Sequence, residues 1–360
     1  MRFVVAMTLM TLVLSGGLRS AHAVDGGQER VGGGSGPLSA RQERALKPGD
    51  VFKECDKCPE LVVVPAGSFM MGSPASEKGR DYDEGPQHEV KIAHPFAVGK
   101  FHVTVDQFAA FVEATGYDAG SLCWGWNGRR PEIRERWSSK ASLNIVTAGG
   151  TSTSEGQGQR PEPQMEHAAA TRLHPGFAQE RSHPVVCVSW KDAKAYVAWL
   201  SRNTGKTYRL LTESEFEYAA RGGSSSRYPF GDDEAQMCRY GNGPDKTAQA
   251  TIPGASGWAV FPCSDGYAYT SPSGSFAANG FGLYDMHGNA WSWVEDCYHD
   301  RYDRAPADDS AWTSRDCSRR VLRGGSWYLR PRNLRAAYRY RYSGIFRFNY
   351  IGFRVARTLD

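Results

Sequence analysis

One stretch of this chain is the most informative about its fold, and it reads Asn279-Gly280-Phe281-Gly282-Leu283-Tyr284-Asp285-Met286-His287-Gly288-Asn289-Ala290-Trp291-Ser292-Trp293. The stretch combines the turn-forming residues Gly, Asn and Asp with large aromatic side chains. The whole chain has the same mixture, because its 360 residues include 40 Gly, 10 Trp and 17 Tyr. Many tight turns around an aromatic core are typical of a loop-rich α+β fold and argue against a helix bundle.

Strands are expected on both sides of this stretch. Before it, Leu61-Val62-Val63-Val64-Pro65 and Ser68-Phe69-Met70-Met71-Gly72 are β-rich runs separated by a Pro-Ala-Gly turn. After it, tyrosines and arginines alternate between Tyr338 and Tyr342. This period of two predicts a strand with one aromatic face and one basic face.

Three short helices are also predicted, each from a capping residue at its start and a glycine at its end. They are expected from Thr104 to Gly116, from Ser189 to Gly205 and from Thr212 to Gly222. Gln107 closes a capping box with Thr104 in the first of them. The sequence therefore predicts capped helices placed among strands within one body.

The N-terminus has the pattern of a secretory signal peptide. Arg2 precedes an apolar run from Phe3 to Leu14, and the segment closes on small residues at Ala23. The run is shorter than the roughly 20 residues that a membrane span needs. We expect residues 1–23 to be removed, with a retained anchor as the alternative, and the mature chain to be secreted or periplasmic without a membrane span.

Two polar stretches are expected to be flexible. Residues 24–50 form a Gly-rich linker with little apolar surface, and residues from about 127 to 181 resemble an insertion into the globular body. The predicted organisation is thus a signal peptide at 1–23, a flexible linker at 24–50, and one domain at 51–360 that carries the insertion.

The chain contains eight cysteines, an even number that favours disulfides over free thiols in an oxidising compartment. Their connectivity does not follow from the sequence alone. Closeness along the chain suggests the pairs Cys238 with Cys263, Cys297 with Cys317, Cys123 with Cys187 and Cys55 with Cys58. The last pair has the spacing of a redox motif, but it precedes a β-run without a βαβ pattern, so a structural disulfide is favoured.

Several segments together carry a family resemblance. Besides residues 279–293, they are Pro65 to Ser73, Glu84 to His88, His183 to Trp190, Arg209 to Gly222, Arg323 to Trp327 and Gly352 to Arg354. In this order and spacing they resemble the formylglycine-generating (sulfatase-modifying-factor) family. The resemblance implies a single domain with a C-type-lectin-like variant fold, little regular secondary structure and bound calcium. It does not decide the function, because one scaffold can carry many sites.

The resemblance also identifies chemistry that is missing. Family enzymes that oxidise a substrate cysteine to formylglycine bind copper through two cysteines after the Gly-Gly-Ser motif, because soft thiolates select Cu(I). Leu329 and Leu334 stand at those positions, so copper is not expected and enzymatic activity is left uncertain. Ser326 matches the serine that lines the family's active site. It is a catalytic candidate, with a structural turn as the alternative, because a nucleophile would also need a base.

Calcium is the structural ion that the resemblance implies, bound by hard oxygen ligands. The family's first site maps onto Asn242, Gly243, Asp265 and Tyr267. The second site maps onto Asp285, Gly288, Ala290 and Ser292. In the second site Ser292 replaces a glutamate usual in the family, and Asp285 replaces an asparagine. The alternative at both places is that Asp and Asn only form turns.

Twelve arginines lie between Arg315 and Arg357, with aromatic residues among them and only Asp316 to offset their charge. Such a segment can bind anionic or aromatic ligands, or it can build the internal salt-bridge frame of the fold. The overall net charge of +4 does not point to a partner.

Three functions follow as hypotheses. The first is an exported, non-catalytic binding or maturation factor for a peptide, glycan or envelope protein. The second is an oxidoreductase or tailoring enzyme with different chemistry, like the relative that helps to mature the siderophore pyoverdine. The third, true formylglycine generation, is opposed by the two leucines. Nucleic acid is not expected as a partner outside the cytoplasm.

Overall fold

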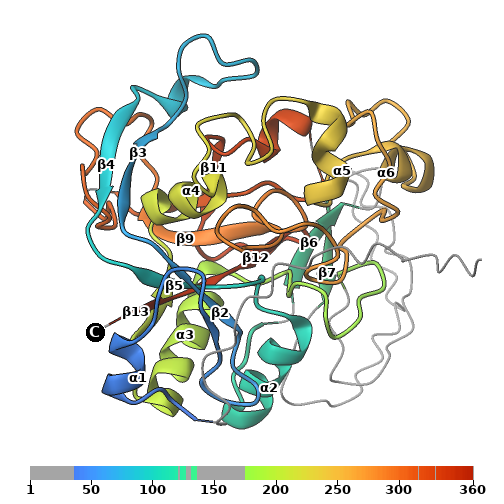
Figure 1. The fold of residues 1–360 in the computed structure, drawn as a ribbon. Helices are drawn as coiled ribbons and strands as arrows, with labels where there is room; N and C mark the ends of the chain where they lie inside the picture. Colours follow the sequence, from blue (N-terminus) through green and yellow to red (C-terminus); the bar gives the residue numbers. More distant parts are fainter. Residues whose placement is uncertain are drawn as a thin grey trace, which may run out of the picture.

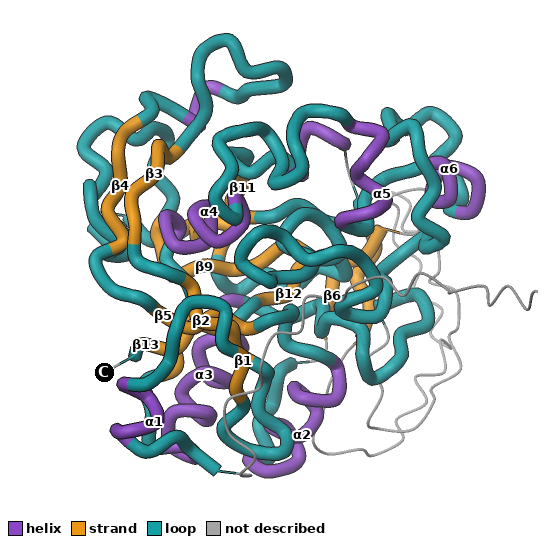
Figure 2. Tube along the Cα trace, in the orientation of Figure 1, coloured by secondary structure: helices purple, strands orange, loops and turns teal. Residues whose placement is uncertain are grey.

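The computed structural model describes residues 36–120, 122–126, 131–135, 175–314, 316–328 and 330–359. Helices and strands follow one another in short runs along these segments, and much of the trace between them is loop (Figure 2). The α+β class expected from the aromatic and turn-forming composition is therefore confirmed. The signal-peptide prediction for residues 1–23 lies outside the described residues.

The three predicted helices are present, and each has the predicted caps. They are α2 (Val105–Thr115), α3 (Trp190–Thr204) and α4 (Glu213–Arg221). In each case the side chain of the preceding Thr or Ser accepts the backbone N–H three residues later, and the helix ends at a glycine in the left-handed conformation. Shorter helices are α1 (Ala40–Arg44), α5 (Met237–Tyr240) and α6 (Lys246–Thr251).

A five-stranded sheet forms one part of the body. Its order is β1 (Val51–Phe52), β2 (Leu61–Val64), β5 (Phe96–Gly99), β13 (Val355–Thr358) and β8 (Tyr208–Leu210). All four pairings are antiparallel, and the sheet joins both ends of the domain because β13 lies between β5 and β8. In Figure 1 the helices α1, α2 and α3 lie on the side of the molecule away from α4, α5 and α6.

A four-stranded sheet carries the end of the stretch quoted first. Its order is β11 (Arg339–Ser343), β10 (Arg319–Arg323), β9 (Trp291–Cys297) and β12 (Ile351–Phe353). Strand β9 pairs with β10 antiparallel and with β12 parallel, so it is an inner strand (Figure 1). The predicted Tyr-Arg strand is confirmed as β11. Two hairpins complete the strands: β3 (Gly67–Met71) with β4 (His88–Ile92), and β6 (Leu122–Trp126) with β7 (Pro131–Glu135).

The core combines aromatic side chains with buried arginines. Trp291, Trp293 and Trp327 are among the largest fully buried side chains. The indole N–H of Trp293 donates to the carbonyl of Val188, which ties β9 to the start of α3. Buried arginine guanidiniums pair with buried glutamates, because a charged group can be buried in a fold of this kind only when it is paired and hydrogen-bonded.

The linker prediction for residues 24–50 is wrong for the part that the structure describes. Ser39 caps α1, Leu38 is buried, and the Glu43 carboxylate is buried against the Arg357 guanidinium of β13. Because this ion pair needs Arg357, which is 314 residues away along the chain, composition alone could not show it. The folded body therefore starts before residue 51.

The structure describes two parts of the predicted insertion at about 127–181. Residues 131–135 form β7, which pairs with β6, and residues 175–181 are also described. Within the latter, the carbonyl of Pro175 accepts a hydrogen bond from the Asn349 side chain. Residues 136–174 lie outside the described residues, so the prediction of flexibility there stays a prediction.

Candidate functional site

The Gly-Gly-Ser motif forms a tight loop directly after β10. Gly324 and Gly325 have φ values of +92° and +74°, which side chains rarely adopt. Ser326 follows them and is fully buried. Its hydroxyl donates to the carbonyl of Tyr328 at 3.1 Å and accepts the N–H of the same residue at 3.2 Å. These contacts make Ser326 part of a local turn, which favours the structural alternative over a nucleophile.

Leu334 occupies an apolar pocket beside this loop. Its side chain is fully buried in a cluster with Tyr228, Met237 and Phe261. A Cβ atom on Gly325 would lie 2.8 Å from Leu334, and a Cβ atom on Gly243 would also lie 2.8 Å from it. The leucine is therefore closely packed at one of the two positions where the resemblance implies copper ligands in the family's enzymes. Leu329, the other position, lies outside the described residues.

All eight cysteines are consumed in disulfides, and the four predicted pairs are confirmed. The bonds join Cys55 to Cys58, Cys123 to Cys187, Cys238 to Cys263 and Cys297 to Cys317. With every cysteine of the sequence paired in the described structure, two thiolates for Cu(I) are not available there.

The four residues of the first predicted calcium site come together between α5, α6 and the loop after Cys263. The backbone N–H groups of Gly243 and Tyr267 donate to the two carboxylate oxygens of Asp265, at 3.3 Å and 2.7 Å. The Asn242 amide donates to the carbonyl of Tyr269 at 2.6 Å, while its oxygen is buried without a hydrogen-bond partner. A buried amide oxygen without a hydrogen-bond partner is the kind of donor that suits a hard cation.

The charges at this site also favour a bound cation. Burial, with repulsion from the neighbouring Asp245 carboxylate, raises the pKa of Asp265 to about 7. The cause is that two acidic groups lie together in a poorly solvated place. A bound cation would remove this penalty, so the donor set of the first site fits calcium.

The second predicted site has a different character. Asp285 is buried in the left-handed conformation, and one of its oxygens accepts the N–H of Gly274. The Ser292 hydroxyl lies 3.0 Å from Nε2 of His102, whose pKa burial holds well below its usual value. The neutral His102 imidazole thus lies within hydrogen-bonding distance of the Ser292 hydroxyl, which stands where the family usually has a glutamate. With a single carboxylate in the set, the second site fits calcium less well than the first.

The remaining residues of that site belong to the frame of the fold. Gly288 has a φ of +96°, and a Cβ atom there would lie 2.1 Å from the carbonyl oxygen of Asn242. Ala290 is buried against the Cys123–Cys187 disulfide. Both positions therefore have a packing reason to be small that is independent of any metal.

Many of the C-terminal arginines are internal. Five of them are at most 1% exposed: Arg323, Arg335, Arg339, Arg354 and Arg357. Four of these guanidiniums pair with buried glutamates, and Arg354 donates to the carbonyls of Gly99 and Tyr284. The salt-bridge frame therefore accounts for these five. A surface groove of about 360 Å³ remains at the edge of β11, lined by Arg319, Tyr340, Arg341, Tyr342, Ser343 and Phe346.

Sequence reasoning missed two residues at these places. Asp245 lies against Asp265, and the signal for it was its position as an N-cap of α6, three residues after Asn242. His102 meets Ser292 although the two residues are 190 positions apart. That contact had no signal in the sequence, because it depends on how β9 meets the segment between β5 and α2 in the folded chain.

Comparison with known proteins identifies the family of this chain. The family model described as "Sulfatase-modifying factor enzyme 1-like domain" matches residues 47–359, so the chain belongs to this family. It is 37% identical to the formylglycine-generating enzyme of Mycobacterium tuberculosis over 261 residues, covering 65% of this chain and 73% of the relative. It is 33% identical to the inactive C-alpha-formylglycine-generating enzyme 2 of Mus musculus over 276 residues, covering 75% and 74%.

Among solved structures, the chain is similar to PvdO from Pseudomonas aeruginosa. The identity is 38%, the TM-score is 0.67, and the match covers 87% of this chain and 100% of PvdO. In the described part of the chain, no helix is both long and apolar enough to cross a membrane.

Proposed function

We propose that this chain is an exported binding or maturation factor of the family and not a copper-dependent formylglycine generator. The observation that carries the proposal is Leu334, which fills one former copper position within an apolar cluster. Leucine offers no ligand atom, and the chain's cysteines are bound in disulfides. The mouse relative, whose name describes it as inactive, supports the view that members of this family exist without that activity.

The activity assay is a direct test. The mature protein is incubated with copper, oxygen and a Cys-x-Pro-x-Arg peptide, and the peptide mass is measured. We expect no aldehyde, whereas the Mycobacterium tuberculosis relative serves as the positive control. Aldehyde formation above the level without protein would refute the proposal.

One observation favours a second candidate, a tailoring enzyme that modifies a protein or a siderophore by other chemistry. The chain aligns with the full length of PvdO at 38% identity. The two proteins therefore share the whole fold, although PvdO is not named as a formylglycine-generating enzyme. Crosslinking in envelope extracts, together with a comparison of metabolites in a deletion strain, separates the candidates. A trapped partner with unchanged metabolites supports the binding factor, and a missing or unmodified small molecule supports the enzyme.

Export is tested separately by cell fractionation and N-terminal sequencing. We expect the protein in the periplasm or the medium, beginning at Val24, and a variant without residues 1–23 in the cytoplasm. Recovery of the full-length chain from the membrane fraction would instead indicate a retained anchor.

A further inference from the structure

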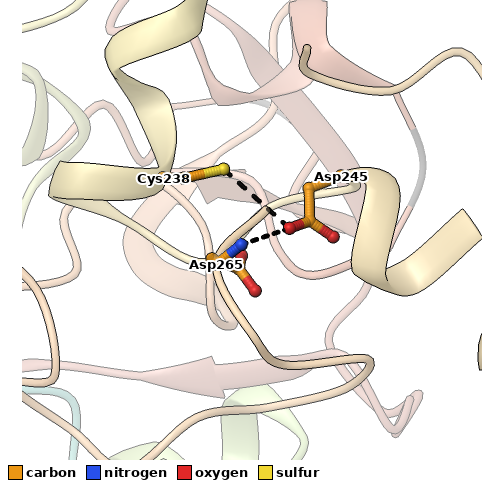
Figure 3. A group of neighbouring side chains, drawn as sticks. All are labelled: Cys238, Asp245 and Asp265. Atoms are coloured by element: carbon orange, nitrogen blue, oxygen red, sulfur yellow. Dashed lines mark hydrogen bonds between the residues drawn. The ribbon is translucent and has the colours of Figure 1, made fainter. Parts of the chain in front are cut away.

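Beside Asp265 of the first predicted calcium site lie a second carboxylate, that of Asp245, and the sulfur of Cys238 (Figure 3). The backbone N–H of Asp265 donates to Oδ2 of Asp245 at 2.5 Å, and Sγ of Cys238 lies 3.9 Å from the same oxygen. The carboxylates and the sulfur have atoms within 4.8 Å of one another. Because Cys238 is disulfide-bonded, its sulfur is not a thiolate ligand. Its role at this place has to be positional.

Asp245 is fixed by the helix that it caps. Its Oδ1 accepts the backbone N–H of Ala248 at 2.8 Å in the first turn of α6, and the whole residue is buried. With one oxygen held by α6, the other is presented to the loop that carries Asp265. The N–H of Asp265 therefore donates to a carboxylate whose position is fixed by the start of α6.

The disulfide fixes the same loop from its other side. Cys263 lies two residues before Asp265, and its bond to Cys238 attaches the loop to α5. The carbonyl of Cys263 also accepts the N–H of Lys246 at the start of α6. The loop is thus held against both helices, and breaking the Cys238–Cys263 bond would free 25 positions of chain from this constraint.

Asn242 is an independent indication that a ligand belongs here. Its side-chain amide lies against the same loop, since its N–H donates to the carbonyl of Tyr269, and its buried oxygen has no hydrogen-bond partner. Gly243, the next residue, donates to Asp265. An unsatisfied acceptor of this kind costs free energy unless a cation or water completes it.

We propose that Asp245 is an additional carboxylate of this calcium site and that the Cys238–Cys263 disulfide holds Asp265 in position against it, so that calcium binds tightly only to the oxidised chain. The inference rests on calcium binding at the first site and is independent of the proposed binding or maturation function. Its physical basis is that a second negative charge strengthens the attraction for a divalent ion, while a pre-positioned loop avoids the entropy cost of ordering on binding.

The first test is calcium titration of the full mature chain by calorimetry, with Asp245→Asn as the variant. Asn keeps an oxygen to cap α6 but removes the charge and the acceptor for the Asp265 N–H. We expect calcium affinity to fall about tenfold to a hundredfold, as for other residues that support metal ligands. Asp308→Asn, which removes a carboxylate from a turn that pairs with β4, should leave the affinity unchanged.

The second test compares two disulfide deletions of similar loop length. Cys238→Ser with Cys263→Ser opens a loop of 25 residues, and Cys297→Ser with Cys317→Ser opens one of 20 residues. Only the first pair should weaken calcium binding by about tenfold or more. Equal losses in both double variants would mean that calcium responds to general destabilisation, which would overturn the proposal.

The third test needs no substitution, because linkage is reciprocal: if the disulfide strengthens calcium binding, calcium must strengthen the disulfide by the same factor. The chain is equilibrated in a series of thiol buffers with and without calcium, alkylated and analysed by mass spectrometry. Calcium should protect Cys238–Cys263 and leave Cys55–Cys58 unaffected. If the wild type binds no calcium, the site itself is wrong. If it binds calcium but Asp245→Asn and the thiol series show no effect, only the coupling is wrong.

Discussion

Leu334 fills the space beside the Gly-Gly-Ser loop with an apolar side chain. It packs among Tyr228, Met237 and Phe261 and against three glycines that have no room for a Cβ atom beside it. The leucine therefore contributes to stability at a position where the family's copper-dependent enzymes keep a ligand. At the level of this residue, the fold therefore has a packing contact that does not depend on a copper ligand.

Leu334→Ala tests that packing contact. Removing a fully buried leucine leaves a cavity, so we expect the free energy of unfolding to fall by about 2–5 kcal/mol. Ile345→Ala is the matched control, because Ile345 is 56% exposed and should cost well under half as much. Urea denaturation measures both. Similar costs for the two variants would show that Leu334 is not tightly packed.

Arg335 is the residue-scale example of the salt-bridge frame. Its guanidinium is buried between Glu77 and Glu84, whereas the neighbouring Arg332 pairs with Asp81 on the surface. Arg335→Met would leave Glu84 buried without its partner, and we expect a loss of about 3–5 kcal/mol. Arg332→Met should cost no more than about 1 kcal/mol. Thermal unfolding of the two variants side by side decides between a structural and a surface role.

Asp296 gives a prediction for pH. Burial, with the negative charge of Glu213 nearby, raises the pKa of Asp296 to about 7 from the ordinary value of 3.8. The folded state therefore holds this proton more tightly than the unfolded state, and the free energy of unfolding should fall as pH rises from about 4 to about 7. Asp296→Asn should flatten that part of the profile, measured by urea unfolding at each pH. An unchanged slope would show that the carboxylate is already ionised at pH 4.

At the scale of elements, the helices were the most predictable part of the fold. The caps of α2, α3 and α4 lie within a few residues of the segments they cap, so the sequence contains the whole signal. Helix α1 was missed although Ser39 and Gln42 form a capping box of the same kind. Its Gly-rich neighbourhood suggested a linker, and only the buried pair of Glu43 with Arg357 explains why it is attached.

Ser189→Ala tests the contribution of a cap to α3. The Ser189 hydroxyl accepts the backbone N–H of Asp192 at 3.1 Å. Its removal leaves that donor unsatisfied at a buried helix start, and we expect a loss of about 1 kcal/mol, within a range of about 0.5–2 kcal/mol. Lys191→Ala, at an exposed position of the same turn, is the control and should be close to neutral. Chemical denaturation of both variants measures the difference.

Across the whole molecule, disulfides and buried ion pairs connect segments that are far apart in the sequence. The Cys123–Cys187 bond joins β6 to the segment before α3. The salt bridges of Arg323, Arg335 and Arg357 reach 106 or more residues along the chain. Such long-range links explain how a domain rich in loops can hold one arrangement.

Calcium removal is the corresponding whole-molecule prediction. A chelator should lower the melting temperature, and restoring calcium to about a hundred times its dissociation constant should return about 2.7 kcal/mol of stability. The Asp265→Asn variant should lose most of this response, because it removes the central carboxylate of the first site. Magnesium should substitute poorly, since this ion requires a stricter octahedral geometry. A melting temperature insensitive to both chelator and calcium would contradict the site.

The family, the α+β class and the capped helices could be read from the sequence, as could the lack of cysteines after the Gly-Gly-Ser motif. These features are local, and each depends on residues close together in the chain. The sequence also supplied the candidate calcium ligands through the resemblance.

The surroundings of those candidates became visible only in the folded chain. They are the turn that contains Ser326, the apolar cluster around Leu334, the His102 imidazole beside Ser292, and Asp245 with the Cys238–Cys263 bond beside Asp265. The physical reason is that burial, hydrogen-bond satisfaction and charge pairing are set by residues that meet only after the chain has folded.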